Sequence, residues 1–248
     1  MAFGGGGAGV RGFGVIAVVV LDTDLTTERD IRLLAPAEAT ICVARALYAN
    51  PTTPENLRAT LPGLGRAAAS IVPGVPLAAL YFACTSAGIV LGHAAVAAAF
   101  AAARPDVPVV TPADAAEQAL RALGARRIGI VTPYLPETAA SVEAHFAASG
   151  FEIAASVALG MADDREMARL APDAIMAAAR RAAVPEADAV FISCTALPAT
   201  ELVADIEAAV GRPVVTSNLA GLWRVFGLAG LVPGPGFGRL RAAAPVAA

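Results

Sequence analysis

A Cys-Thr pair occurs twice in this chain, each time after an apolar run with the length of a buried strand. Cys84 follows residues 76–83, and Cys194 follows residues 187–193, so the two cysteines are 110 positions apart (194 minus 84). Short apolar runs of this kind are typical of strands that are covered on both faces in a parallel sheet. Both cysteines are also followed by a Pro-Val-Val-Thr segment, at 108–111 and 213–216. These matches predict a duplicated α/β unit.

Strand-like runs alternate with helix-compatible segments through both halves of the chain. The apolar run at 13–21 has a counterpart at 127–132. Such alternation predicts the α/β fold class, with two similar Rossmann-like lobes of parallel sheet, a pseudo-twofold axis between them and the active site in the cleft. The predicted division is a flexible N-terminal tail at 1–11, lobe 1 at 12–112 and 213–230, lobe 2 at 113–212, and a loosely packed, Pro- and Gly-rich C-terminal tail at 231–248.

Composition narrows the classes of partner. The chain has 248 residues, 57% of them hydrophobic and 16% charged, with a formal net charge of -3. It has no basic patch, so neither nucleic acid nor an anionic membrane surface is an expected partner. The apolar run 86–103 approaches the length of a membrane span, but its many alanines, with Gly92 and His93, predict a helix packed inside a cytoplasmic protein. Small soluble ligands are therefore the expected partners, and the apolar composition favours a homodimer. The site residues described below narrow the expected substrate to a small carboxylic acid.

The three cysteines predict reduced thiols. Their number is odd and their spacing has no disulfide framework, which favours free thiols in a reducing compartment. Together with two scattered histidines they lack the spacing of a metal site, so no metal is expected. Cys42 lies within an apolar run and is predicted to be a small buried hydrophobic residue.

Polar turns follow the predicted strands, at the edge where ligands bind in parallel α/β sheets. If the two lobes face each other, Cys84 and Cys194 approach the cleft from opposite sides. A helix predicted after each cysteine would lower the pKa of its thiol and favour the thiolate. A purely structural pair of buried cysteines is the alternative. The turns are Asp22–Asp24, Cys84–Ser86, Pro133–Tyr134, Cys194–Thr195 and Ser217–Asn218.

Several longer motifs resemble the aspartate/glutamate racemase superfamily, and most closely its maleate isomerase and ectoine-utilisation protein A branch. Arylmalonate decarboxylase is a more distant resemblance. The similarity runs from about Arg11 to Gly230, and it implies catalysis without a cofactor. The motifs that carry it are Thr26–Asp30, Tyr48–Leu57, Ala83–Ala87, Asp163–Met167, Phe191–Leu197 and Pro213–Asn218.

The resemblance implies roles for individual residues. Cys84 and Cys194 would be the catalytic pair, and Tyr134 would contact the substrate. Asp24 and Asp164 stand where maleate isomerases have asparagine, and an aspartate there would repel a second substrate carboxylate unless it is protonated. The expected substrate-binding residues are Asp24, Thr85, Ser86, Tyr134, Asp164, Thr195, Ala196, Ser217 and Asn218.

Four functions are compatible with these residues. The first is a racemase or epimerase that moves the proton alpha to the carboxylate of a small amino or hydroxy acid, with a place in ectoine-type degradation implied by the resemblance. The second is a maleate-type cis-trans isomerase, in which the Cys84 thiolate adds to the double bond. The third is an arylmalonate-type decarboxylase, which has glycine in place of one of the cysteines. The fourth is a non-catalytic protein that binds a small metabolite.

Overall fold

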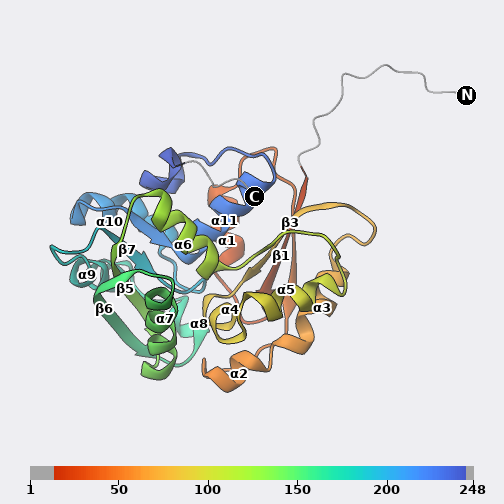
Figure 1. Ribbon diagram of the computed structural model, residues 1–248, viewed down its shortest axis with the longest axis horizontal. Coiled ribbons are helices and arrows are strands. Elements are labelled where there is room, and N and C mark those ends of the chain that lie inside the picture. The colour runs from red at the N-terminus through yellow and green to blue at the C-terminus, as the bar shows by residue number, and fades with distance from the viewer. Residues whose placement is uncertain (1–13, 244–248) are drawn as a thin grey trace, which may run out of the picture.

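The computed structural model describes residues 14–243, and it contains two parallel sheets with helices on their faces. Strand order is β2-β1-β3-β4 in the first sheet and β6-β5-β7-β8 in the second, so each sheet has the same arrangement. Figure 1 shows the two sheets as neighbouring lobes, with α6 and α11 near their junction. The predicted α/β fold class is confirmed. The tail predicted at 1–11 lies outside the described residues, as do residues 244–248.

The elements of the first half bear out the predicted alternation. They are β1 (Val15–Leu21), α1 (Thr27–Leu34), β2 (Ile41–Ala46), α2 (Pro54–Arg58), α3 (Leu61–Ser70), β3 (Leu77–Ala83), α4 (Thr85–Leu91), α5 (His93–Ala101), β4 (Val109–Val110) and α6 (Pro112–Ala122). Those of the second half are β5 (Arg127–Tyr134), α7 (Pro136–Ala148), β6 (Glu152–Met161), α8 (Asp164–Met167), α9 (Pro172–Ala182), β7 (Ala189–Ile192), the 3-10 helix η1 (Thr200–Leu202), α10 (Val203–Val210), β8 (Val214–Thr216), α11 (Ser217–Leu228) and the 3-10 helix η2 (Pro235–Ala242).

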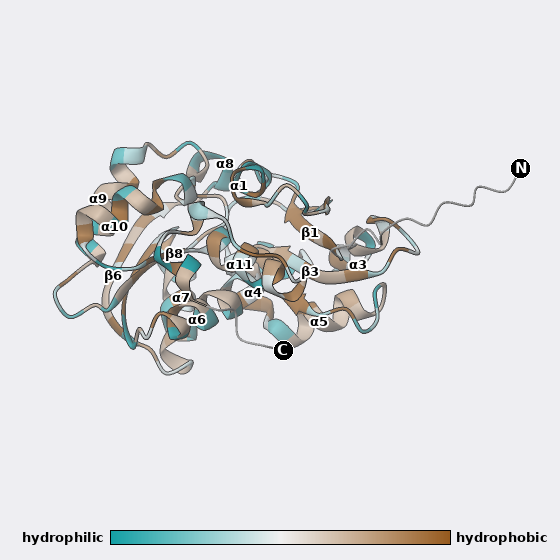
Figure 2. Ribbon diagram, turned by 90° about the horizontal axis from the view of Figure 1, so that it is seen from above, coloured by the Kyte–Doolittle hydropathy of each residue, from teal (hydrophilic) through white to brown (hydrophobic). Residues whose placement is uncertain are grey.

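The first strand of each half is central in its sheet because its residues are apolar on both faces. In β1, Val18 pairs with Val43 on one side and with Tyr81 on the other. In β5, Ile130 pairs with both β6 and β7, and Gly129 allows α9 to approach closely. A Cβ atom on Gly129 would lie 2.0 Å from the carbonyl oxygen of Ala182. Figure 2 shows hydrophobic colouring along β1 and β3 and hydrophilic colouring on α8.

The apolar run at 86–103 folds as two helices rather than one. Gly92 has a φ of 79°, a left-handed conformation that glycine adopts at little cost and that ends α4. His93 then begins α5. Within residues 14–243, no helix is long and apolar enough to cross a membrane.

The segment 213–230 is divided between the lobes, whereas the sequence places all of it in lobe 1. Its strand, β8, pairs with β7, and Val214 lies beside Val190 in the second sheet. Its helix, α11, packs against β3 of the first sheet and against α6. Tyr81 of β3 and Trp223 of α11 belong to one buried cluster that also contains residues of the second sheet, such as Phe191. The two lobes therefore share a hydrophobic core.

The expectation of a loosely packed C-terminal tail is wrong for residues 231–243. Phe237 and Leu240 of η2 are fully buried. The Phe237 ring packs on Phe226 with a centroid separation of 6.0 Å. The indole Nε1 of Trp223 donates a hydrogen bond to the carbonyl of Ala243. Burial of these two large apolar side chains thus orders the segment despite its many Pro and Gly residues.

Candidate active site

A small pocket forms where the strand ends of the two lobes meet, and both predicted thiols line it. Cys84 follows β3 of the first lobe, and Cys194 follows β7 of the second. The cavity has a volume of about 20 Å³, roughly the space of one water molecule. The pocket is lined by Leu21, Asp24, Tyr48, Thr52, Leu57, Cys84, Ser86, Tyr134, Asp164, Met167, Cys194, Thr195 and Ala196.

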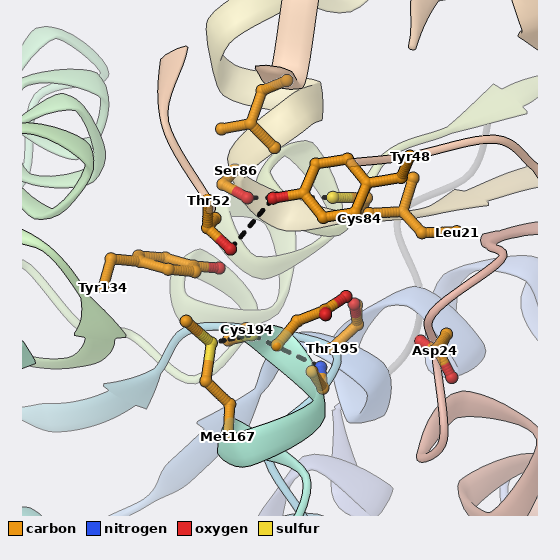
Figure 3. Close-up of a pocket in the computed structure, with 13 residues that line it drawn as sticks. Leu21, Asp24, Tyr48, Thr52, Cys84, Ser86, Tyr134, Met167, Cys194 and Thr195 are labelled. Carbon is orange, nitrogen blue, oxygen red and sulfur yellow. Dashed lines mark hydrogen bonds between the residues drawn. The ribbon is translucent and has the colours of Figure 1, made fainter. Parts of the chain in front are cut away.

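The two thiols have different local supports. Figure 3 shows Cys84 on the side of the pocket that carries Tyr48 and Ser86, and Cys194 on the side that carries Met167. The Cys84 sulfur lies 3.7 Å from the hydroxyl of Ser86. Cys194 has a φ of 98°, a conformation that side-chain-bearing residues rarely adopt and that is common at functional sites. Its sulfur accepts a hydrogen bond from the backbone N–H of Ala196 at 3.4 Å.

The expected lowering of the thiol pKa values is wrong. Burial raises the pKa of both Cys84 and Cys194 to about 12, and the hydrogen bonds to the sulfurs offset only part of that effect. Desolvation disfavours the thiolate more than the nearby N–H groups favour it. In addition, no helix directly follows Cys194, because a turn at 195–199 and η1 precede α10. In the ligand-free pocket both cysteines are therefore neutral thiols.

Two tyrosines and a loop close the pocket. The Tyr134 hydroxyl bonds to Cys194, and burial raises the pKa of Tyr134 well above its usual value. Tyr48 lies in the loop between β2 and α2, and its hydroxyl donates to Thr52 at 3.0 Å. The same loop bonds to the second lobe, since the Thr52 N–H donates to the carbonyl of Ala162 at 2.8 Å. Thr138 of α7 also donates to the Thr52 carbonyl. Residues 47–53 thus join the lobes above the thiols.

Two buried carboxylates face the same cavity. Asp24 accepts hydrogen bonds from the backbone N–H groups of Thr26 and Thr27, at 3.0 and 2.8 Å, and burial raises the pKa of its carboxyl group. Asp164 accepts from the Asn50 amide at 2.8 Å and from the Thr23 hydroxyl. All of these donors are uncharged. Neither carboxylate is paired with a cation inside the pocket, and no Lys, Arg or His is among the lining residues of the described chain.

Comparison with known proteins identifies the family. The arylmalonate decarboxylase family matches residues 91–241. The maleate isomerase of Nocardia farcinica is 32% identical over 237 residues, which cover 91% of this chain and 94% of the relative. The arylmalonate decarboxylase of Bordetella bronchiseptica is 32% identical over 138 residues, covering 54% and 58%. This chain belongs to the arylmalonate decarboxylase family.

A solved structure matches nearly the whole fold. It is a mutant of the N. farcinica maleate cis-trans isomerase with a covalently bound succinylcysteine intermediate, and it superposes with a TM-score of 0.83 at 30% identity. The match covers 92% of this chain and 98% of that structure. The predicted resemblance to the maleate isomerase branch, with arylmalonate decarboxylase more distant, is confirmed. This member of the family is an isomerase.

Eight of the predicted site residues line the pocket, and three lie behind its wall. The three are Thr85, Ser217 and Asn218: Ser217 and Asn218 bond to lining residues, and Thr85 bonds to Ser217. The Ser217 hydroxyl accepts from Thr85 at 2.8 Å and from the N–H of Cys194 at 3.0 Å. The Asn218 amide donates to the carbonyl of Thr195 at 2.9 Å. The hydroxyl of Thr195, which does line the pocket, donates to the carbonyl of Ala83. These contacts hold the two strand ends together.

Five lining residues have no predicted role in the sequence analysis. Leu21 ends β1 and resembles any core residue in the sequence. Tyr48, Thr52 and Leu57 belong to the resemblance motif Tyr48–Leu57, and Met167 belongs to Asp163–Met167. These two motifs are the sequence signal that could have identified the four residues as part of the site. Their positions over the thiols, however, depend on contacts between the lobes, which the sequence does not reveal.

A separate cluster of charged residues lies on α6 and α7. Asp114, Glu117 and His145 have ligand atoms within 4.8 Å of one another. His145 pairs with Glu117 at 2.9 Å, and His93 pairs with Asp114. The cluster satisfies its own charges, and none of its members lines the pocket with the thiols.

Asp30 makes stability depend on pH. It lies behind the pocket, and its Oδ2 accepts from Thr200 at 2.6 Å and from Asn218 at 2.8 Å. Burial raises its pKa from 3.8 to about 6. The folded state therefore holds this proton more tightly than the unfolded state, so the stability present below pH 4 is lost as pH rises through 6. The total loss is about 3 kcal/mol.

The Asp30→Asn variant is expected to lack this loss of stability, because an amide does not titrate. Its oxygen can still accept the hydrogen bonds from Thr200 and Asn218, so the local structure is kept. Urea unfolding at pH 4.5 and 7.5 measures the effect. The free energy of unfolding of the wild type relative to Asp30→Asn should fall by about 2 kcal/mol between these pH values. An equal difference at both pH values would show that Asp30 titrates normally in the folded protein.

Proposed function

We propose that this protein catalyses cis-trans isomerisation of a small cis-alkenoic acid through a covalent adduct on Cys84. The observation that carries the proposal is that one thiol from each lobe lines a single pocket. A second support is the matching relative, whose structure holds a succinylcysteine intermediate. The first hypothesis, a racemase, has less support because the relatives described above are cis-trans isomerases and a decarboxylase.

The proposed reaction adds a thiol across the double bond and then removes it. The Cys84 sulfur bonds to one alkene carbon while Cys194 gives its proton to the other carbon and takes the proton of Cys84. The π bond is lost, and one C–S and one C–H bond form. The remaining carbon–carbon single bond rotates. Cys194 then recovers a proton from carbon, returns one to Cys84 as the C–S bond breaks, and the trans alkene leaves.

This relay fits the electrostatics of the pocket. Both sulfurs carry protons at neutral pH because burial raises their pKa values to about 12. A relay that keeps both cysteines neutral before and after addition avoids a desolvated thiolate as a resting state. The bond from Tyr134 to Cys194 stabilises negative charge on that sulfur while the protons move. Tyr134 is thereby a positioning residue for Cys194.

The test is to detect both the product and the adduct. The wild-type protein would be incubated with maleate, its monoamide maleamate and citraconate. Proton NMR reports the trans isomers, and intact-mass analysis after an acid quench reports a protein mass increased by one substrate. Peptide mapping should place the added mass on Cys84.

A parallel incubation with amino and hydroxy acids in D2O tests the racemase hypothesis. We expect no deuterium at the alpha carbon of these compounds. Alpha-carbon exchange, without an adduct or a trans product from any alkene, would overturn the proposed function in favour of proton transfer. Evolution of CO2 from an arylmalonate would favour the decarboxylase hypothesis instead.

A further inference from the structure

We infer that the substrate carries a single carboxylate at one end and a hydrogen-bond donor, such as a carboxamide, at the other. A monoamide of cis-butenedioic acid has this form. The inference rests on the proposed function, because it names the substrate class for the same pocket. It follows from how charges, donors and acceptors are distributed around the two thiols.

The charge of the pocket disfavours a dianion. Asp24 and Asp164 are 5% and 7% exposed, and both line the cavity. The nearest arginine contact is that of Arg45, whose guanidinium donates to the backbone carbonyl of Asp24 and pairs with Glu28 outside the pocket. A second substrate carboxylate would therefore approach two buried carboxyl groups with no cation between them, and Asp24, whose pKa burial already raises, would become still harder to ionise beside it.

The same two carboxylates favour a donor on the ligand. The Asp24 Oδ2 atom accepts one hydrogen bond, from the Thr27 hydroxyl at 2.8 Å. The Asp164 carboxylate accepts from Asn50 and Thr23. A carboxylate has about four lone-pair directions, so both groups can accept further hydrogen bonds from an amide N–H.

Two hydroxyl groups that can donate to a ligand lie across the cavity from Asp24. Tyr48 donates to Thr52, and Thr195 donates to the carbonyl of Ala83. Among the described residues, the Thr52 and Ser86 hydroxyls donate to no oxygen, and Ser86 faces only the Cys84 sulfur. Figure 3 shows Thr52 and Ser86 close together, with Asp24 across the pocket. This pair of hydroxyl groups can therefore bind one substrate carboxylate, while Asp24 on the opposite side can accept a hydrogen bond from an N–H group.

The chemistry of addition agrees with this polarity. A sulfur adds to an alkene more readily when the attached carbonyl group can draw electron density from it. A neutral carboxamide does so better than a carboxylate whose charge no cation offsets. The pocket without a lysine, arginine or histidine thus suits an alkene activated by an amide.

The experiment compares maleamate with maleate at pH 8, where maleate is a dianion. The proteins are wild type, Asp24→Asn, Asp164→Asn, the double variant, and Asp163→Asn as a matched control. Asp163 adjoins Asp164 and shares the Asn50 amide with it, but its carboxylate also bonds to Arg165 and does not line the pocket, and an asparagine oxygen can still accept from Asn50. Asparagine keeps the accepted bonds, because its oxygen can cap the Thr26 and Thr27 N–H groups and its amide can donate to a threonine hydroxyl.

In the wild type, kcat/KM for maleamate should exceed that for maleate by about 100-fold, which corresponds to about 2.7 kcal/mol. The double variant should shift this ratio toward maleate by about 100-fold, and Asp163→Asn should leave it within twofold. Thermal melts followed by circular dichroism check folding, and a single variant replaces the double variant if the latter unfolds.

Equal or greater activity of the wild type on maleate, with the ratio unchanged in the aspartate variants, overturns the substrate class while the Cys84 adduct still supports the isomerase. Absence of an adduct and of a trans product with both compounds overturns the proposed function and this inference together.

Discussion

Replacing Cys84 with serine is expected to lower kcat/KM by at least about 10⁴-fold and to abolish the covalent adduct. A serine hydroxyl at this position is a far weaker nucleophile than the thiol, and the pocket offers it no histidine base. Cys84 directly follows β3 and is 5% exposed, so serine fits its space without a change in the fold. The measurement combines NMR assay of the trans product with intact-mass analysis of quenched reactions.

The matched control is Cys42→Ser. Cys42 lies in β2, is half-buried, and is not among the residues that line the pocket. This variant should keep activity within about twofold of the wild type and should still form the adduct. If Cys84→Ser retained turnover within tenfold of the wild type, or if peptide mapping placed the added mass on another cysteine, the role proposed for Cys84 would be wrong.

The positions of the two thiols could be predicted from sequence because each follows a strand whose register is set locally. The runs before Cys84 and Cys194 are largely apolar, so each contains an inner strand, β3 or β7, that ends at the cleft. The matched motifs then imply the same place in each lobe. Eight of the predicted site residues line the pocket for the same reason, since most of them directly follow a strand.

The loop that covers the pocket could not be placed from sequence. Tyr48 and Thr52 lie between β2 and α2, and their positions depend on hydrogen bonds to Ala162 and Thr138 of the other lobe. Such contacts join residues far apart in the chain and leave no periodic pattern. The division of residues 213–230 escaped prediction similarly, because β8 is a strand of the second sheet whereas α11, which directly follows it, packs against β3 of the first.

The thiol pKa values were mispredicted because two effects oppose each other. A strand end followed by a helix suggests N–H groups near the sulfur, and the Ala87 N–H does bond to Cys84. Complete burial of the sulfur has the larger effect. Sequence indicates the local donors but not the closure of the cavity, which depends on the opposite lobe. A mechanism that begins from neutral thiols follows only from the folded structure.

The Cys194→Ser variant is expected to separate adduct formation from product release. With Cys194 replaced, the adduct on Cys84 should accumulate toward one per protein while kcat falls by at least about 10³-fold. Excess substrate can still drive slow addition at Cys84, whereas elimination requires removal of a proton from carbon, for which a serine hydroxyl is poorly suited. The N–H of Ala196 can bond to a serine oxygen as it does to the Cys194 sulfur, so the local turn is retained.

Intact-mass analysis distinguishes a chemical role for Cys194 from a merely structural one. A variant that only distorts the pocket loses adduct and turnover together, whereas loss of the proton relay leaves the adduct and removes the turnover. A Cys194→Ser protein that isomerises at the wild-type rate without accumulating an adduct would contradict the relay and leave Cys84 as the single acting thiol.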